Sequence, residues 1–213
     1  MNLKSSFLCF VFFCFGLFTY GQDARKILEE ASAAYNNAGG VAAQFTLDVK
    51  DQKNKMTYSY DGNIEMEGDA FRIEIPEGIT WFDGATQWVY VKGTEEVTIT
   101  APGEDEQASI SPSALFNVYK TGYELKYNGI KTENNKSVLE IEMISSKKNP
   151  DFPKIIARLD KGTNLFSSVT FIDNSGLEHM VSIRNMKTGL DLPGKTFSFD
   201  EKQYPQAELI DLR

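Results

Sequence analysis

The fold is decided by four short segments: residues 45–49 read FTLDV, 56–60 MTYSY, 71–75 FRIEI and 88–91 WVYV. In each segment apolar and polar residues alternate, which is typical of a β-strand with one apolar and one polar face. Turn residues separate the segments, as in an antiparallel meander. The apolar face of such a sheet must be covered by helices, by a second sheet or by a ligand, so what covers it is the functional question.

The same rhythm continues through most of the chain. Turn signals include Asp61–Gly62, Asp83–Gly84, Asn128–Gly129, Asn134–Asn135 and the sequence NSG at residues 174–176. The segments between such signals predict about eleven strands.

A helix is predicted before the first strand. Apolar residues recur at helical spacing up to Tyr35, Gln22 or Asp23 can begin the helix, and the pair Gly39–Gly40 can end it. From Val41 onward the period changes to two.

The N-terminus has the pattern of a secretory signal peptide. An apolar run at residues 7–18 follows Lys4 and ends in small and polar residues. Because a membrane-spanning helix needs about 20 apolar residues, the run favours a signal peptide at residues 1–21 over a membrane anchor. The sequence therefore predicts a soluble, exported protein.

Residues 22–213 are predicted to form one domain, since they are enough for a single core and no linker divides them. Both cysteines, Cys9 and Cys14, lie in the predicted signal peptide, so the mature protein needs no disulfide. The net charge of −8 becomes −9 when Lys4 is removed. This acidic balance argues against nucleic acid as a partner.

Two stretches interrupt the meander: residues 102–119, and a long polar connection at residues 145–153. The first holds an acidic loop and a short predicted helix. An acidic loop at Glu104–Glu106 is a candidate docking surface for a basic partner, although a plain solvated loop has the same composition. After it, Ser111 can cap a short helix that reaches Tyr119. A helix inserted into a meander is expected to act as a lid or plug over the sheet.

The sequence offers little for catalysis. His179 is the only histidine, and its place in an alternating strand is typical of a surface or partly buried residue. Carboxylates such as Glu140 and Glu142 alternate along strands, as on the solvated face of a half-buried sheet. No phosphate-binding glycine loop is present. We therefore expect no catalytic residues, no metal site, no cofactor and no enzymatic activity.

Several motifs, in order, resemble the LolA family of periplasmic carriers of outer-membrane lipoproteins. The strand at residues 71–75 ends in Pro76 and leads to a hairpin with the family's D-G-x-x-x-W-x-Y pattern at residues 83–90. A late strand with an Asp-x-x-Gly turn at residues 168–176 and the ending at residues 195–213 also resemble the family. The resemblance implies an α+β fold: an incomplete, strongly curved antiparallel half-barrel whose concave apolar face is covered by helices, Ser113–Tyr119 being one of them.

One departure from the family concerns the lid. Well-known members carry an Arg-Pro pair before the strand, and the arginine holds the lid closed, whereas Glu67 and Gly68 occupy these positions here. Arg72 is nearby, but its phase is opposite to that of Phe71 and Ile73, so it is predicted to face away from the cavity.

The resemblance implies a function without chemistry: the protein binds the acyl chains of lipoproteins in an apolar cavity and carries them across the periplasm. Its partners would be an inner-membrane ABC-type releasing complex and an outer-membrane receptor, and the carrier would be a monomer. The predicted cavity residues are Phe45, Leu47, Phe71, Ile73, Trp88, Tyr90, Leu115 and Phe116. The same side chains could equally form an ordinary core.

Two alternatives remain open at this stage. One is a periplasmic module with the same half-barrel that senses lipid or lipoprotein instead of carrying it. The other is an all-β enzyme or carbohydrate-binding protein, for which an exposed aromatic platform is expected. The position of Trp88 and Tyr90, in a dry cavity or on an open rim, distinguishes these readings.

Overall fold

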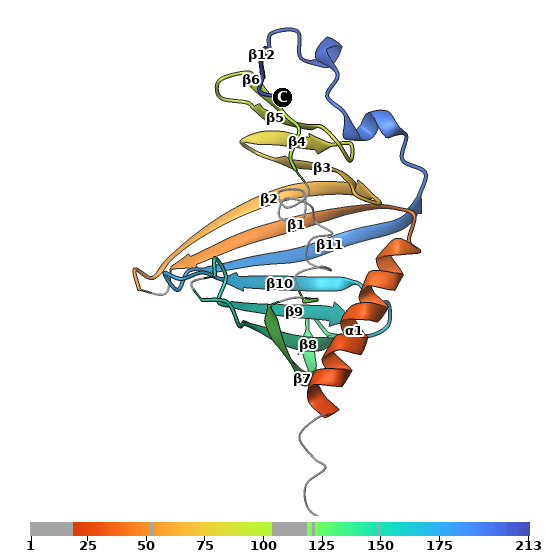
Figure 1. Cartoon of the computed structure of the whole chain (residues 1–213), viewed down its shortest axis with the longest axis vertical. Helices are drawn as coiled ribbons and strands as arrows, with labels where there is room; N and C mark the ends of the chain where they lie inside the picture. The colour runs from red at the N-terminus through yellow and green to blue at the C-terminus, as the bar shows by residue number, and fades with distance from the viewer. Residues whose placement is uncertain (1–18, 52, 104–118, 121, 149) are drawn as a thin grey trace, which may run out of the picture.

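The computed structural model describes residues 19–213 apart from positions 52, 104–118, 121 and 149, with side chains from residue 23 onward. One long, curled sheet runs through this part of the chain, and an α-helix crosses one half of it (Figure 1). The predicted signal peptide lies outside the described residues except for its last three, which are the first residues of the helix.

The elements follow one another in a simple order. They are α1 (Thr19–Asn36), β1 (Gly40–Asp51), β2 (Met56–Glu67), β3 (Ala70–Ile75), β4 (Gly78–Phe82), β5 (Gln87–Val91), β6 (Glu96–Thr100), β7 (Tyr123–Glu133), β8 (Lys136–Ser145), β9 (Lys154–Asp160), β10 (Phe166–Ile172), β11 (Glu178–Leu190), the short 3-10 helices η2 (Gly194–Phe197) and η3 (Glu201–Gln203), and β12 (Glu208–Asp211).

All twelve described strands belong to one sheet with the order β12-β6-β5-β4-β3-β2-β1-β11-β10-β9-β8-β7. Neighbouring strands are antiparallel, except that β12 runs parallel to β6. The sheet therefore consists of two meanders, β1 to β6 and β7 to β11, joined where β1 pairs with β11.

The number of strands differs from the predicted value of about eleven for identifiable reasons. The parallel strand β12 does not follow the hairpin rhythm that the prediction used. Two predicted turns also lie inside strands: Asp61–Gly62 belongs to β2, and Asn128–Gly129 forms an irregularity in the pairing of β7 with β8. A glycine dipeptide within a strand can thus mark a bulge or a close contact as well as a turn.

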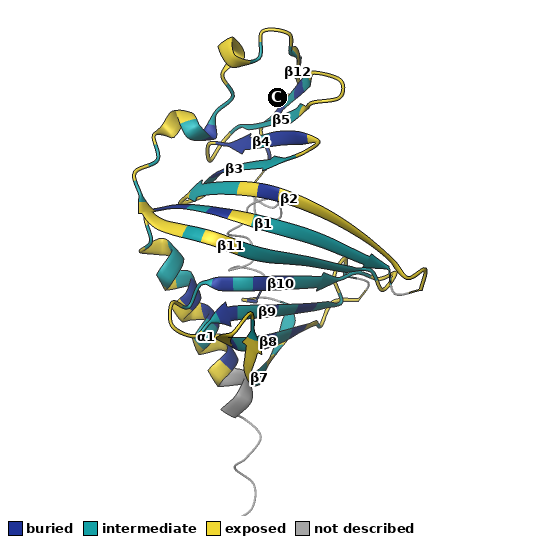
Figure 2. Cartoon of the chain, turned by 180° about the vertical axis from the view of Figure 1, so that it is seen from behind, coloured by how far each residue is buried: buried dark blue, intermediate teal, exposed yellow. Residues whose placement is uncertain are grey.

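The helix α1 defines what we call the inner face, the face of the sheet on which it packs. It ends as predicted, because Gly39 adopts a φ of +66°, which glycine tolerates at a helix end. Its buried residues lie every three or four positions and pack on β8, β9 and β10 (Figure 2). The core beneath α1 consists of Ala24, Leu28, Ala31, Tyr119, Ile141, Met143, Ile155, Ala157, Leu159, Phe166 and Val169.

A single described α-helix, α1, thus packs on one half of the inner face. The second predicted cover, Ser113–Tyr119, and the acidic loop Glu104–Glu106 lie outside the described residues, apart from Tyr119. Tyr119 is buried in the core beneath α1, and this burial raises the pKa of its hydroxyl. The last residue of the predicted lid therefore packs beneath the helix.

A second core lies on the opposite, outer face, over β4, β5 and β6. Trp81 is buried there between Phe199, at a ring-centroid distance of 5.6 Å, and Tyr204, at 5.7 Å. Tyr204 also contacts Tyr90 at 4.9 Å, and burial raises the pKa of the Tyr204 hydroxyl. The segment after β11 therefore crosses to the outer face and covers it with aromatic rings.

Tyr35 ties the end of α1 to β10 and makes stability sensitive to alkaline pH. The Phe166 amide donates to its hydroxyl oxygen at 3.3 Å, and the hydroxyl is enclosed although the residue as a whole is only partly buried. Burial, partly offset by this hydrogen bond, raises the pKa of Tyr35 from 10.0 to about 12. The contribution is complete below pH 10 and is lost as pH rises to about 12, since the unfolded chain releases this proton first.

We expect the free energy of unfolding to fall by about 2–3 kcal/mol over this interval through Tyr35 alone. In Tyr35→Phe the decrease between pH 10 and 12 should be smaller by that amount, measured by urea unfolding at each pH. Tyr58→Phe, at an exposed position, is the control and should follow the parent protein. An unchanged alkaline slope in Tyr35→Phe would contradict the assignment.

Candidate functional site

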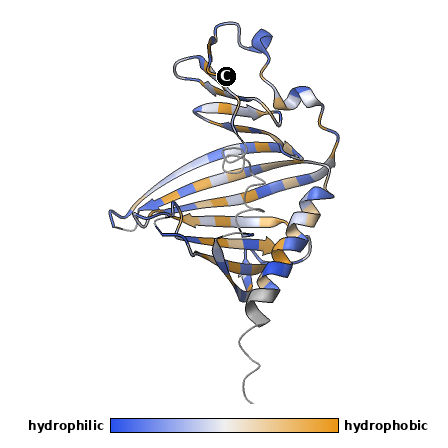
Figure 3. Cartoon of the chain, viewed as in Figure 1, coloured by the Kyte–Doolittle hydropathy of each residue, from blue (hydrophilic) through white to orange (hydrophobic). Residues whose placement is uncertain are grey.

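Beside the core beneath α1, the inner face of the sheet carries a second apolar surface, whose side chains are only half-buried. It lies on β11, β1, β2 and β3, where apolar and polar residues alternate (Figure 3). These strands supply no fully buried residue to the core beneath α1, although Ile183 packs against the edge of that core. We call this surface the inner strip. It consists of Val181, Ile183, Phe45, Leu47, Val49, Ile64 and Ile73.

Strand register places these side chains together. Phe45 lies opposite Ile183, and Leu47 opposite Val181, across the junction between the two meanders. In an antiparallel pair, residues directly opposite each other point to the same face. The strip is therefore continuous across β1 and β11 even though these strands are distant in sequence.

Within the strip, Phe45 packs against Gly62 of β2. It lies opposite Gly62, and a Cβ atom at Gly62 would overlap the tip of the Phe45 ring and lie 2.8 Å from the carbonyl oxygen of Glu74. The absence of a side chain at Gly62 lets the tip of the ring approach the backbone of β2. This contact explains why a glycine that resembled a turn residue is found inside a strand.

Exposure along the strip increases toward the β1–β2 hairpin. Val41 and Ala43, at the start of β1, are buried, whereas Met56, Tyr58 and Tyr60, at the start of β2, are 46%, 50% and 36% exposed (Figure 2). All three of these β2 side chains lie on the inner face, because Tyr60 is opposite Leu47 and Tyr58 is opposite Val49. The strip thus has a buried end and an open end.

His179 lies in the same cross-strand row at the open end, opposite Val49. Its Nε2 is 3.2 Å from Asp173 Oδ2, and the Phe152 ring lies edge-on to it at 6.4 Å. The hydroxyl of Ser175 donates to Asp173 at 2.7 Å, and this bond, together with those from His179 and two backbone amides, holds the pKa of Asp173 well below its usual range. His179 is half-buried in a strand, as predicted.

The side chains predicted to line one cavity do not share one face. Phe45 and Leu47 are in the inner strip with Ile73, and Phe71 is buried on the same face beside Phe82, at a ring-centroid distance of 5.4 Å. Leu115 and Phe116 lie outside the described residues.

Trp88 and Tyr90 lie on the outer face. Trp88 is opposite Trp81, and Trp81 is opposite Arg72, so these three side chains share one face. Arg72 is next to Phe71 in β3 and therefore points to the opposite face from Phe71. The two aromatics are therefore not part of an inner cavity. Both are half-buried on the outer face, and Tyr90 contacts the C-terminal segment through Tyr204. Val181 and Ile183 were not predicted as site residues, although alternation at residues 179–183 was a usable signal.

Arg72 faces away from Phe71 and Ile73, as predicted. It forms ion pairs with Glu74 at 2.7 Å and with Glu65 at 3.4 Å, and its guanidinium lies 6.0 Å from the centre of a Trp81 ring. The bond from Arg72 is the main cause of the lowered pKa of Glu74. Arg72 thus serves the outer face and does not replace an arginine that would hold a lid over the inner one.

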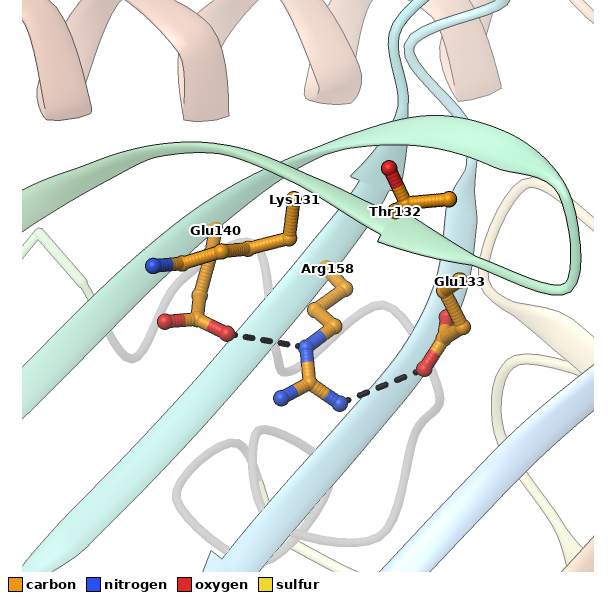
Figure 4. A pocket seen from close by; sticks show the side chains of 5 residues that line it. All are labelled: Lys131, Thr132, Glu133, Glu140 and Arg158. Carbon is orange, nitrogen blue, oxygen red and sulfur yellow. Dashed lines mark hydrogen bonds and ion pairs between the residues drawn. The ribbon is translucent and has the colours of Figure 1, made fainter.

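A polar pocket of about 460 Å³ lies on the outer face of β7 to β9, where Lys131 and Thr132 also line it (Figure 4). Arg158 donates to Glu140 at 2.9 Å and to Glu133 at 3.2 Å. The hydroxyl of the buried Ser168 donates to Glu133 at 3.1 Å. Arg158 is thus paired with both carboxylates, and these bonds fasten the β7–β8 hairpin to β9 and β10.

The described part of the chain holds no group of three or more histidine, cysteine or acidic side chains close enough together to bind a metal ion. Among the described helices, none is long and apolar enough to cross a membrane.

Comparison of folds gives similar architectures at low sequence identity. An uncharacterized conserved protein from Thermus thermophilus has a TM-score of 0.61 at 14% identity, covering 89% of this chain and 99% of its own. LprF from Mycobacterium bovis has a TM-score of 0.51 at 10% identity, covering 82% and 97%. A putative outer membrane lipoprotein-sorting protein domain from Vibrio parahaemolyticus has a TM-score of 0.47 at 15% identity, covering 83% and 97%.

Sequence comparison identifies the family directly. No match was found among curated proteins. The sequence profile described as outer membrane lipoprotein carrier protein LolA, however, matches residues 17–170, which include α1 and all strands up to most of β10. The chain therefore belongs to the LolA family of outer membrane lipoprotein carrier proteins.

Proposed function

We propose that the inner strip binds the acyl chains of lipoproteins, and that the protein is an exported periplasmic carrier that moves them from the inner to the outer membrane. The observation that supports this most is an apolar, half-buried surface on the inner face of a chain of the LolA family. Half-buried aliphatic side chains retain area that a ligand can remove from water, whereas fully buried ones do not.

The energetics suit reversible binding. Each methylene group that leaves water contributes about 0.8 kcal/mol, so two acyl chains supply a large driving force even if only part of each chain is covered. A carrier must also release its cargo, so a surface that remains partly open suits the task better than a closed cavity. An inner-membrane ABC-type releasing complex and an outer-membrane receptor would be the partners on the two sides.

A sensing module is the second candidate. It is favoured by the outward position of Arg72 and by Glu67 and Gly68, which stand where a lid-holding arginine is expected. Without that arginine a bound lipid would not be enclosed in the same way. A sensor would bind acylated ligands like a carrier but would not transfer them to acceptor membranes.

The test compares two variants in one strand. Val181 and Met180 are adjacent, half-buried and on opposite faces of β11, so Val181→Lys and Met180→Lys place the same charge on the inner and outer faces. We expect wild type and Met180→Lys to retain a diacylated lipopeptide in native mass spectrometry, and Val181→Lys to bind it at least tenfold more weakly, about 1.4 kcal/mol or more. The same peptide without acyl chains should not bind.

Equal retention of the acylated and unacylated peptides by the wild type would refute lipid binding. Equal loss in both lysine variants, with both folded by circular dichroism, would place the ligand somewhere other than the inner strip. Transfer of the bound lipopeptide to acceptor vesicles carrying outer-membrane lipids then separates a carrier from a sensor.

A further inference from the structure

The two ends of the inner strip differ in polarity, and we propose that the strip therefore binds a diacylglyceryl group in one orientation only. The ester carbonyls would lie over Tyr58 and Tyr60 at the open end, and the acyl chains would run toward Phe45 and Ile183. This inference rests on the proposed function. It adds which polar group of the ligand is recognised and which side chains recognise it.

Polarity changes from one cross-strand row to the next along the strip. The innermost row is entirely apolar, the second contains one hydroxyl, and the outermost contains a hydroxyl and an imidazole. These rows are Gly62, Phe45 and Ile183; then Tyr60, Leu47, Val181 and Val169; then Tyr58, Val49, His179 and Phe171. An acyl glyceride has the same gradient, with methyl ends at one extreme and esters at the other.

The two tyrosine hydroxyls at the open end can each donate a hydrogen bond to a ligand. Within the described residues, the Tyr60 hydroxyl has no hydrogen-bond partner, and that of Tyr58 meets only the sulfur of Met56 at 3.9 Å. A thioether is a weak acceptor, whereas an ester carbonyl is a good one. The rings would contact the first methylenes of the chains while the hydroxyls donate to the carbonyls, the usual behaviour of tyrosine between apolar and polar surroundings.

The open end carries charges of both signs. Asp51 ends β1 beside the hairpin, and Asp173 is bonded to His179. Of the lysines in the hairpin, Lys53 donates to the Ser175 carbonyl oxygen at 3.0 Å and Lys55 is exposed. Because these opposite charges offset one another, they give an anionic headgroup little net attraction, so the occupant we infer from the tyrosine hydroxyls is the uncharged diacylglyceryl end of a lipopeptide.

Two photoreactive lipopeptides test the orientation. One carries a diazirine next to the glyceryl esters and the other carries it at the end of an acyl chain. After irradiation, mass spectrometry should place the ester probe on residues 56–60 and the chain-end probe near Phe45 or Ile183. The opposite assignment, or the same mixture of sites for both probes, would overturn a single orientation.

Tyrosine variants test the hydrogen bonds. We expect the double variant Tyr58→Phe/Tyr60→Phe to bind a diester lipopeptide about threefold to tenfold more weakly and to bind the dialkyl ether analogue, which lacks carbonyls, as the wild type does. Tyr90→Phe, on the outer face, is the matched control and should change neither. Equal effects on ester and ether ligands, or none, would overturn the proposed donors, as would tighter binding of phosphatidylglycerol than of the lipopeptide.

The outcomes separate the two proposals. If the wild type binds neither lipopeptide, both the proposed function and the orientation fail. If it binds them but the cross-links are reversed or mixed, acyl binding stands and only the orientation is refuted. Thermal unfolding of the tyrosine variants checks that their folds are intact, and exposed phenylalanines at these positions should leave it nearly unchanged.

Discussion

Replacing Trp81 with alanine is expected to lower the free energy of unfolding by about 3–5 kcal/mol, the usual cost of removing a buried tryptophan. Trp81 is only 4% exposed and contacts both Phe199 and Tyr204. These two rings also contact each other, at 5.3 Å, so the variant leaves a cavity between β4 and the C-terminal segment. Urea unfolding followed by circular dichroism measures the loss.

Trp88→Ala is the matched control, because Trp88 lies opposite Trp81 on the same face but is only half-buried. Its loss should be clearly smaller. In Trp81→Ala, trypsin should also cut faster after Lys202, in η3, since the segment loses its main contact. A loss in Trp81→Ala no greater than in Trp88→Ala would contradict the assigned role of the outer core.

The second large effect is expected at the helix. Leu28 is 1% exposed and is the largest α1 side chain in the core on β8, β9 and β10. We expect Leu28→Ala to lower the free energy of unfolding by about 2–5 kcal/mol, because it removes buried methyl groups and leaves a cavity that the rigid sheet cannot close. The same urea experiment measures it.

An exposed position on the same helix provides the comparison. Glu30 and Lys26 lie one helical turn apart and form a solvent-exposed ion pair at 3.9 Å. Glu30→Ala should therefore lower the free energy of unfolding by no more than about 0.5 kcal/mol. If α1 undocks locally in Leu28→Ala, limited trypsin digestion should also cut faster after Arg25. Stability equal to that of Glu30→Ala would show that the helix is not anchored through Leu28.

Much of the fold follows from the sequence pattern. Alternation identified the strands, because a half-buried strand must alternate, and Gly39 marked the end of the helix, because that position needs a positive φ. The opposite phases of Phe71 and Arg72 also predicted their opposite faces correctly. Each of these features depends on neighbours in sequence, so a local pattern contains the information.

The face on which Trp88 and Tyr90 lie could not be read in this way. Alternation shows which residues of one strand share a face, but the turns decide how that face continues in the next strand. Phe71 is opposite Phe82, and Phe82 is opposite Gln87, which sends Trp88 to the other side. Because β4 and β5 carry apolar residues on both faces, hydrophobicity did not reveal the change.

The seam between β1 and β11 has a consequence for the kinetics of folding. Within each meander, strands pair with their neighbours in sequence, so only short loops need to close. Lys50 pairs with Glu178, and Glu96 with Glu208, each across more than 100 positions. Closing such long loops costs chain entropy before any contact repays it, and high contact order slows folding. We therefore expect the two meanders to form early and the seam to set the folding rate.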